Sequence, residues 1–291
     1  MQAAFSFQER DGVLTGPVRN PRNSARHLGA GSIHDDATAQ KLGFRGGTVA
    51  GSLHMEQFPP LLVAALGEGW LKTGGLSLYF KYATTDNEPV QAFARRPRPG
   101  GAHVDIWMDD AHGNRVADGT ANVGGPDPDS ALRQRIAAMP PARDIRILAG
   151  VSAGNTGTRI PTRISADALA ARLAVITEPM AAYQDPARYG QRIATPALQV
   201  QALRAAEPGI LPRNPDFGVG LFGAIELQLH SGPVLVEHDY EAEARVLAVG
   251  ETPKTEYLYY EATLLEPASN SRVLSMIMML RFMKASSKLW S

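Results

Sequence analysis

The chain has 291 residues, 44% of them hydrophobic, with 29 basic and 29 acidic side chains. This balance gives no general electrostatic attraction for nucleic acid or an anionic membrane. The absence of cysteine excludes disulfides, thiolate metal ligands and a cysteine nucleophile. No apolar run reaches the roughly 18 residues of a membrane span, and the first residues lack a signal-peptide pattern. We therefore expect a cytoplasmic protein.

The first structured segment is a short helix predicted over residues 36–42, where Asp35 and Asp36 supply carboxylates for the free amides of the first turn. An apolar stretch, residues 49–70, follows and contains the pair Pro59-Pro60. Proline removes a backbone donor and clashes with the preceding turn. The helix is therefore predicted to end near Phe58 and to restart with Pro60 in its first turn.

Strand patterns complete the first half of the chain. In residues 102–123, Val104, Ile106 and Met108 alternate with polar residues, and the turn signals of residues 110–114 predict a hairpin. Residues 124–143 are rich in proline, glycine and charge, which is typical of a linker. We place a boundary there, between an N-terminal half, residues 1–130, and a C-terminal half, residues 131–291.

The second half repeats this order of elements. A short helical piece is predicted at residues 185–189, and a helix capped by Thr195 runs to about Ala206, followed by four strand patterns. The offset between the halves is steady, because Tyr183 lies 149 positions after His34. The chain is thus predicted to be a duplicated α+β unit with antiparallel sheets. The two sheets would join edge to edge or face the same helices.

The residues that carry candidate chemistry lie before and at the start of the first apolar helix. His34 precedes the short helix, and Gly46, Gly47 and Gly51 allow backbone to approach a ligand closely. If a helix begins near Gly51, its unpaired amides point at any oxygen that gains negative charge. A general base beside such donors suits reactions at or next to a carbonyl. His34 equally fits a polar residue that closes a helix end.

This segment resembles the MaoC-like, R-specific enoyl-CoA hydratase family, which has the hotdog fold. The matching residues are His34, Asp36, Ala39, Gly43-Phe44 and Gly51. The resemblance implies a double hotdog, in which an antiparallel sheet wraps a long helix in each half. It implies reversible addition of water to an enoyl thioester of CoA or acyl carrier protein. His34 would then be the acid/base, with Asp36 beside it, and the Gly51 amide would polarise the thioester carbonyl. No cofactor is implied, and a homodimer is possible.

The sequence departs from the family pattern at several positions. The family aspartate five places before the histidine is Gly29 here, and the histidine that precedes the helix glycine is Ala50. In the second half the histidine position holds Tyr183, which predicts a non-catalytic half. A site without the aspartate lacks half of the family's acid/base pair.

Further residues are candidates for substrate binding. Glu56 lies on the central helix, where hotdog thioesterases place a carboxylate, and His54 lies in the same turn region; both fit exposed helix residues as well. Arg95, Arg96 and Arg98 end a predicted strand and could clamp the phosphates of CoA, because guanidinium forks suit phosphate oxygens; a solvated turn is the alternative. The seven histidines show no metal-ligand spacing, so no metal site is predicted.

Four functions remain compatible with the sequence. The leading hypothesis is a hydratase or dehydratase that acts on an enoyl or 3-hydroxyacyl thioester. The alternatives are a diverged hotdog lyase, isomerase or cyclase of secondary metabolism, a thioesterase that uses Glu56, and an acyl or ligand binder without catalysis.

Overall fold

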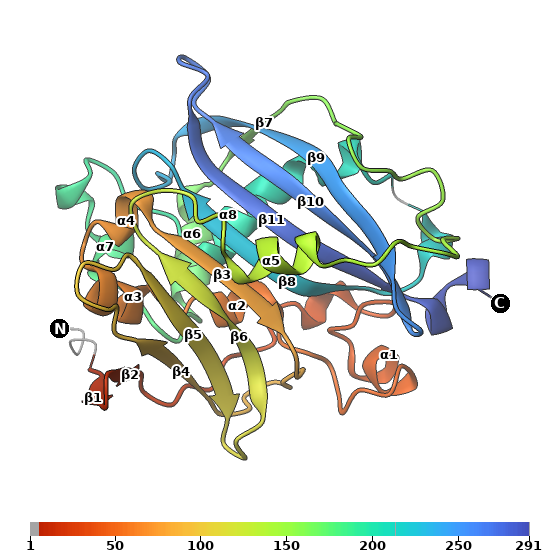
Figure 1. Cartoon of the computed structure of the whole chain (residues 1–291), viewed down its shortest axis with the longest axis horizontal. Helices are drawn as coiled ribbons and strands as arrows, with labels where there is room; N and C mark the ends of the chain where they lie inside the picture. Colours follow the sequence, from red (N-terminus) through yellow and green to blue (C-terminus); the bar gives the residue numbers. More distant parts are fainter. Residues whose placement is uncertain (1–5, 213, 291) are drawn as a thin grey trace.

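The structure is a computed structural model, which describes residues 6–212 and 214–290. Its centre is an antiparallel sheet of eleven strands in the order β1-β2-β4-β5-β6-β3-β8-β11-β10-β9-β7 (Figure 1). The strands are β1 (Gln8–Arg10), β2 (Val13–Thr15), β3 (Gly75–Phe80), β4 (Val90–Arg95), β5 (His103–Asp110), β6 (Arg115–Asn122), β7 (Ile160–Arg163), β8 (Gly220–Leu229), β9 (Asp239–Glu251), β10 (Thr255–Leu265) and β11 (Arg272–Met283).

Short helices surround this sheet. They are α1 (Asp36–Lys41), α2 (Gly51–Met55), α3 (Pro59–Leu66), α4 (Trp70–Thr73), α5 (Ala131–Ala137), α6 (Ala166–Leu173), α7 (Ala181–Gln184) and α8 (Pro196–Leu203), which continues into the 3₁₀ turn η3 (Arg204–Gly209). None of the helices in residues 6–212 and 214–290 combines the length and apolarity needed to cross a membrane.

The two halves of the chain join edge to edge. Strands β1 to β6 lie on one side of the sheet and β7 to β11 on the other, and they meet where β3 pairs with β8. This pairing extends from Gly75 opposite Gln228 to Tyr79 opposite Ala224. The junction gives backbone partners to two strand edges that would otherwise be exposed. It makes one continuous sheet out of the two repeated units.

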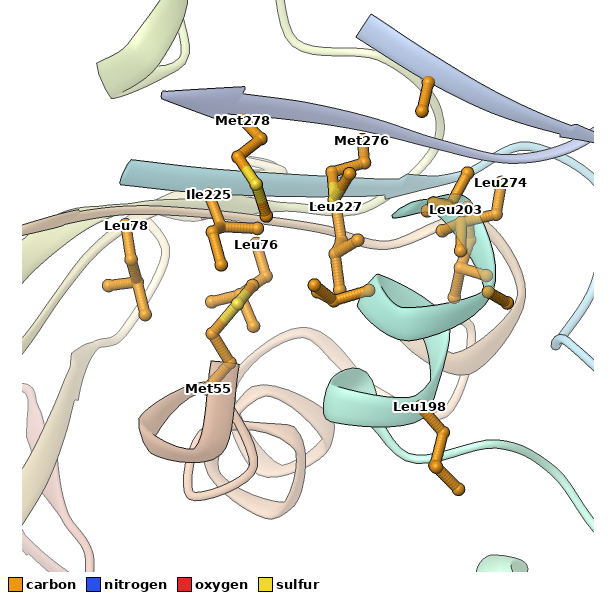
Figure 2. Close-up of a cluster of buried hydrophobic side chains, with 14 of the residues drawn as sticks. Met55, Leu76, Leu78, Leu198, Leu203, Ile225, Leu227, Leu274, Met276 and Met278 are labelled. Carbon is orange, nitrogen blue, oxygen red and sulfur yellow. The ribbon is translucent and has the colours of Figure 1, made fainter. Parts of the chain in front are cut away.

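The central helices pack on one face of this sheet. Figure 2 shows Met55 of α2 and Leu203 of α8 beneath β3, β8 and β11, whose side chains include Leu76 and Met278. The first helix is interrupted as predicted: α2 ends at Met55, and α3 begins at Pro59 with Phe58 as its cap. Both prolines thus occupy first-turn positions, where no intrahelical amide bond is lost.

Strand β11 is buried on both faces. Met276 and Met278 belong to the main core, whereas Ile277 and Met279 pack with Leu132 on the other face. Leu132 belongs to α5, which lies across the sheet from α2 and α8 (Figure 1). Part of the expected linker is therefore a packed helix, because its leucine and isoleucine fall on one helical face.

The hydrogen bonds of Ser130 at the start of α5 can be tested by mutation. The Ser130 hydroxyl accepts the Arg133 amide at 3.3 Å and donates to the buried carboxylate of Glu226. Ser130→Ala removes both bonds, so we expect a loss of about 1–2 kcal/mol in the free energy of unfolding. Urea denaturation measures this loss. Ser165→Ala, at the exposed cap of α6, is the matched control and should cost less; equal losses would contradict a role for Glu226.

Candidate active site

A cavity of about 610 Å³ opens where β3 and β8 part. Their pairing stops at Tyr79, and the first residues of β8, from Gly220, pair only with β11. The lining comes from both halves and both faces of the sheet. It includes Ile33, His34, Phe44, Thr48, Val49, Gly51, His54, Phe80, Lys81, Thr84, Val116, Gly220, Leu221, Phe222, Lys254, Arg281 and Met283.

His34 lies at the end of the loop before α1, and its imidazole is half-buried in the cavity wall. Its Nδ1 lies 2.7 Å from the carbonyl oxygen of Thr48. A carbonyl only accepts, so Nδ1 carries the proton and Nε2 keeps a free lone pair. Burial lowers the pKa of His34 below its ordinary value, although the bond to Thr48 opposes this. The imidazole is therefore a neutral base at neutral pH.

Gly47 holds the His34 loop in place. A Cβ on Gly47 would lie 2.2 Å from the carbonyl oxygen of His34, so only glycine allows this approach. The Gly47 amide donates to Asp36 Oδ1 at 2.8 Å. Asp36 is not part of the cavity lining. The helix cap is Asp35, whose carboxylate accepts the amide of Thr38 at 2.9 Å. Asp36 therefore stabilises the loop through its hydrogen bond to Gly47.

Gly51 is the first residue of α2 and lines the cavity. A Cβ there would lie 2.4 Å from the ring of Phe80, so a larger residue would have to displace this ring. Within the described residues no acceptor contacts the Gly51 amide, which remains available to a ligand. His34 and this amide therefore line one cavity.

Among the described residues of the cavity lining, no carboxylate takes the place of the aspartate that the resemblance would put at position 29. Gly29 lies in a turn with φ of +70°, and the described residues that line the cavity include neither aspartate nor glutamate. Glu207 lines an adjacent groove that His34 also borders. Its carboxylate accepts hydrogen bonds from Arg204 at 2.8 Å and from the Tyr260 hydroxyl at 2.7 Å. Glu207 is thus bound to other partners.

His54 is a cavity residue and not an exposed helix residue. Its side chain is 3% exposed, and its Nε2 lies 2.7 Å from the hydroxyl of Thr84, which is 1% exposed. Burial lowers the pKa of His54 to about 4, so the ring is uncharged at neutral pH. Nothing in the local sequence of Thr84 indicated that it would lie at the site.

Glu56 lies outside the cavity lining and is 1% exposed. Burial raises the pKa of its carboxyl to about 7, opposed by Arg172, the Thr195 hydroxyl and the Ala197 amide. Arg172 Nε lies 3.0 Å from Glu56 Oε2. Neither carboxylate oxygen has a well-aligned hydrogen bond to the described residues, so the attraction is mainly between charges. Glu56 is therefore not an accessible carboxylate of the kind that a thioesterase reaction in the cavity would use.

The three arginines expected as a phosphate clamp lie elsewhere. Arg95 stacks over Trp107 and faces Asp105, and the Arg96 guanidinium donates to Glu9 at 2.8 Å. Arg98 belongs to the turn after β4. None of them lines the cavity. They follow β4, and β5 and β6 separate β4 from β3 at the β3–β8 junction.

Basic side chains from other segments line the cavity instead. They are Lys81, Lys254 and Arg281. Lys81 pairs with Asp118, whereas no carboxylate of the described residues pairs with Lys254 or Arg281. Arg281 is half-buried and stacks over Tyr79, 5.3 Å from the ring centre. An arginine held in this way keeps hydrogen-bond donors for an anion.

The corresponding place in the second half is filled. Tyr183 is 2% exposed, and the hollow beside it has a volume of only about 30 Å³, between side chains that include Pro59 and Pro196. Pro196 is the first residue of α8, as Gly51 is of α2. Proline has no amide hydrogen, so this position offers no donor to a ligand. Among the described residues no cluster of three metal-binding side chains is present.

Neither a family model nor a curated protein matches the sequence. Solved structures do match its fold. A Chloroflexus aurantiacus protein described as a MaoC domain dehydratase covers 92% of this chain and 94% of its own, with 13% identity and a TM-score of 0.60. A Mycobacterium tuberculosis protein described as a double hotdog covers 97% of both chains, with 14% identity and a TM-score of 0.57. The chain has a double hotdog fold.

A further structure that matches the fold is the dehydratase domain of PpsC from M. tuberculosis, solved with C12:1-CoA. It covers 96% of this chain and 97% of its own, with 10% identity and a TM-score of 0.51. At these identities the likeness concerns the fold. In the double hotdog described here, the cavity lies at the junction of the two halves.

Proposed function

We propose that this double hotdog is a hydratase or dehydratase for an enoyl or 3-hydroxyacyl thioester. The observation that carries the proposal is the cavity that His34 and Gly51 share, in which neither His34 Nε2 nor the Gly51 amide has a partner among the described residues. The structures with a similar fold include proteins described as dehydratases. The sequence resemblance to MaoC-like hydratases supports the same reaction.

The reaction follows from these two groups. In the dehydration direction, His34 Nε2 takes a proton from C2 of the 3-hydroxyacyl thioester. Negative charge then grows on the thioester oxygen, where the Gly51 amide stabilises it. The C3–O bond breaks as the C2–C3 double bond forms, and the hydroxide leaves with the proton from His34 as water. His34 ends neutral, and the reverse sequence adds water.

The basic lining supports a phosphate-bearing carrier. Arg281 and Lys254 lie without carboxylate partners in the lining, and both CoA and the arm of acyl carrier protein carry phosphate. Arg281→Gln is therefore expected to raise KM about 10-fold with little change in kcat, because a charged hydrogen bond to the carrier is lost and the reacting atoms are untouched. Arg98→Gln, outside the cavity, is the comparison; a larger effect of that variant would favour the clamp expected from the sequence.

Turnover assays test the proposal. Purified protein is incubated with crotonyl-CoA, longer enoyl-CoA thioesters and their 3-hydroxyacyl counterparts, free and carrier-bound, and the products are identified by mass spectrometry. Gain or loss of water is expected. No change in any substrate would overturn the proposal, and tight binding without change would indicate an acyl binder. Thiol release would indicate a thioesterase.

A second candidate is a diverged hotdog enzyme of secondary metabolism. The observation that favours it is the lack of a carboxylate among the described residues of the cavity lining. A single imidazole suffices to move one proton, as in an isomerisation or cyclisation. This alternative predicts a product of unchanged mass with a shifted double bond or a new ring, and inertness toward simple enoyl-CoA thioesters.

A further inference from the structure

The side-chain pair His54–Thr84 has no role in the reaction as described above. Both residues line the cavity and are almost fully buried, at 3% and 1% exposure. Within the described residues, the only hydrogen bond of either side chain is to the other, 2.7 Å between His54 Nε2 and Thr84 Oγ1. Polar groups at this depth cost free energy unless they are paired, so the remaining donor and acceptor of this pair are candidates for binding a ligand.

The direction of the bond follows from the other ring nitrogen. His54 Nδ1 is buried and has no hydrogen-bond partner in the described part of the chain. The ring is neutral, because burial lowers its pKa to about 4 against the opposing charge of Glu88. A proton on Nδ1 would leave a buried N–H that a ligand in the cavity cannot reach. A proton on Nε2 makes the Thr84 hydroxyl the donor that is left over, and Thr84 lines the cavity, where a ligand can accept from it. The proton is therefore assigned to Nε2, which donates to the Thr84 oxygen.

The Thr84 hydroxyl hydrogen is consequently turned away from His54. No acceptor for it is found among residues 6–212 and 214–290. The Thr84 carbonyl accepts the Val49 amide at 2.9 Å, which fixes Thr84 beside the segment from Thr48 to Gly51. Thr48 anchors the His34 ring through its own carbonyl. The Thr84 hydroxyl is therefore a fixed donor beside the segment whose Thr48 carbonyl holds the His34 ring.

We propose that Thr84 donates a hydrogen bond to the carbonyl oxygen of the bound acyl thioester, and that His54 orients this hydroxyl. The inference rests on the proposed function and deepens it, because it assigns a residue that binds the acyl carbonyl of the substrate. Negative charge grows on that oxygen as the C2 proton leaves. A donor fixed in advance stabilises the charge without reorganisation. Thr84 contacts the substrate, and His54 acts through it as a positioning residue.

Comparing two CoA ligands isolates the hydrogen bond from Thr84 to the thioester carbonyl. Butyryl-CoA has the thioester carbonyl, and S-butyl-CoA, a thioether, lacks it. The wild type is expected to prefer butyryl-CoA, and Thr84→Val to reduce this preference about 5- to 10-fold, as loss of one hydrogen bond implies. Thr84→Ser keeps the hydroxyl and should keep the preference. Thr263→Val, at a buried position of β10, controls for the general effect of the substitution.

Kinetics and nitrogen NMR complete the test. Thr84→Val should lower kcat about 10²-fold, as expected for loss of one oxyanion donor, and His54→Leu should lower it in the same sense. Nitrogen shifts of the His54 ring should show the proton on Nε2. A proton on Nδ1 would overturn the orienting role of His54. An unchanged thioester preference in Thr84→Val would overturn the role of Thr84.

The outcomes separate this inference from the proposed function. If the wild type turns over thioesters and Thr84→Val matches it, the proposed function stands and the inference is wrong. If no thioester is turned over but Thr84→Val loses the preference for butyryl-CoA, the proposed reaction is wrong and the carbonyl-binding role stands.

Discussion

Arg172→Met is expected to destabilise the folded chain by about 3–5 kcal/mol at pH 8, the usual cost of leaving a buried charge without its partner. Glu56 is 1% exposed, and Arg172 Nε is its ion-pair partner at 3.0 Å. At pH 5 the loss should be much smaller. Burial already raises the Glu56 pKa to about 7, and removing Arg172 raises it further, so at pH 5 the carboxyl is protonated and needs no counterion.

The pH dependence has a definite sign. The folded pKa of Glu56 is above its unfolded value of 4.5, so the unfolded chain releases this proton first. The Glu56 contribution to stability therefore falls from pH 4.5 to pH 7, by about 3 kcal/mol in the wild type. In Arg172→Met the fall continues above pH 7. Urea denaturation across this range measures both curves.

Two further variants check the cause. Glu56→Gln combined with Arg172→Met should recover most of the stability lost at pH 8, because no charge is left buried. Arg188→Met breaks the exposed pair with Glu68 and should cost about 0–1 kcal/mol at any pH. A loss in Arg172→Met that is independent of pH would show that packing, and not the Glu56 charge, is responsible.

His34→Gln is expected to lower kcat by about 10²- to 10⁴-fold, the usual contribution of a positioned base, with a small change in KM. The base works only when neutral, and burial lowers the pKa of His34 below its ordinary 6.5. The wild-type rate should therefore rise with pH along a limb centred below 6.5 and then level off. The variant should lose this limb.

The control for this variant is His103→Gln, an exposed histidine paired with Asp127. It should keep the wild-type rate. Equal thermal midpoints for wild type and His34→Gln would show that the fold is retained. Full activity in His34→Gln, or a wild-type limb centred above 6.5, would contradict the assignment of His34 as the base.

The fold was largely predictable because its signals are local. Pro59-Pro60 marks the break between α2 and α3, and the turn of residues 110–114 marks the β5–β6 hairpin. Thr195 marks the start of α8, as its side chain accepts the Leu198 amide. The helix α5 was missed because proline and glycine on both sides of it are typical of a linker.

The site was only partly predictable. His34 and Gly51 fall within one short motif, so the sequence placed them together. Arg281, by contrast, reaches the cavity only because β3 and β8 diverge after Tyr79, and pairing between strands so distant in the chain leaves no local pattern. Glu56 looked like an exposed helix residue, and its partner Arg172 comes from the other half of the chain.

The contrast between a cavity of about 610 Å³ beside His34 and a hollow of about 30 Å³ beside Tyr183 has an evolutionary consequence. If the proposed reaction needs only the site at His34, the second half is free to hold a buried tyrosine, Tyr183, at the corresponding position. It did not become dispensable, because it supplies Gly220, Lys254 and Arg281 to the wall of the first site. Selection would therefore preserve packing around Tyr183 and chemistry around His34, and neither half expressed alone would contain a complete site.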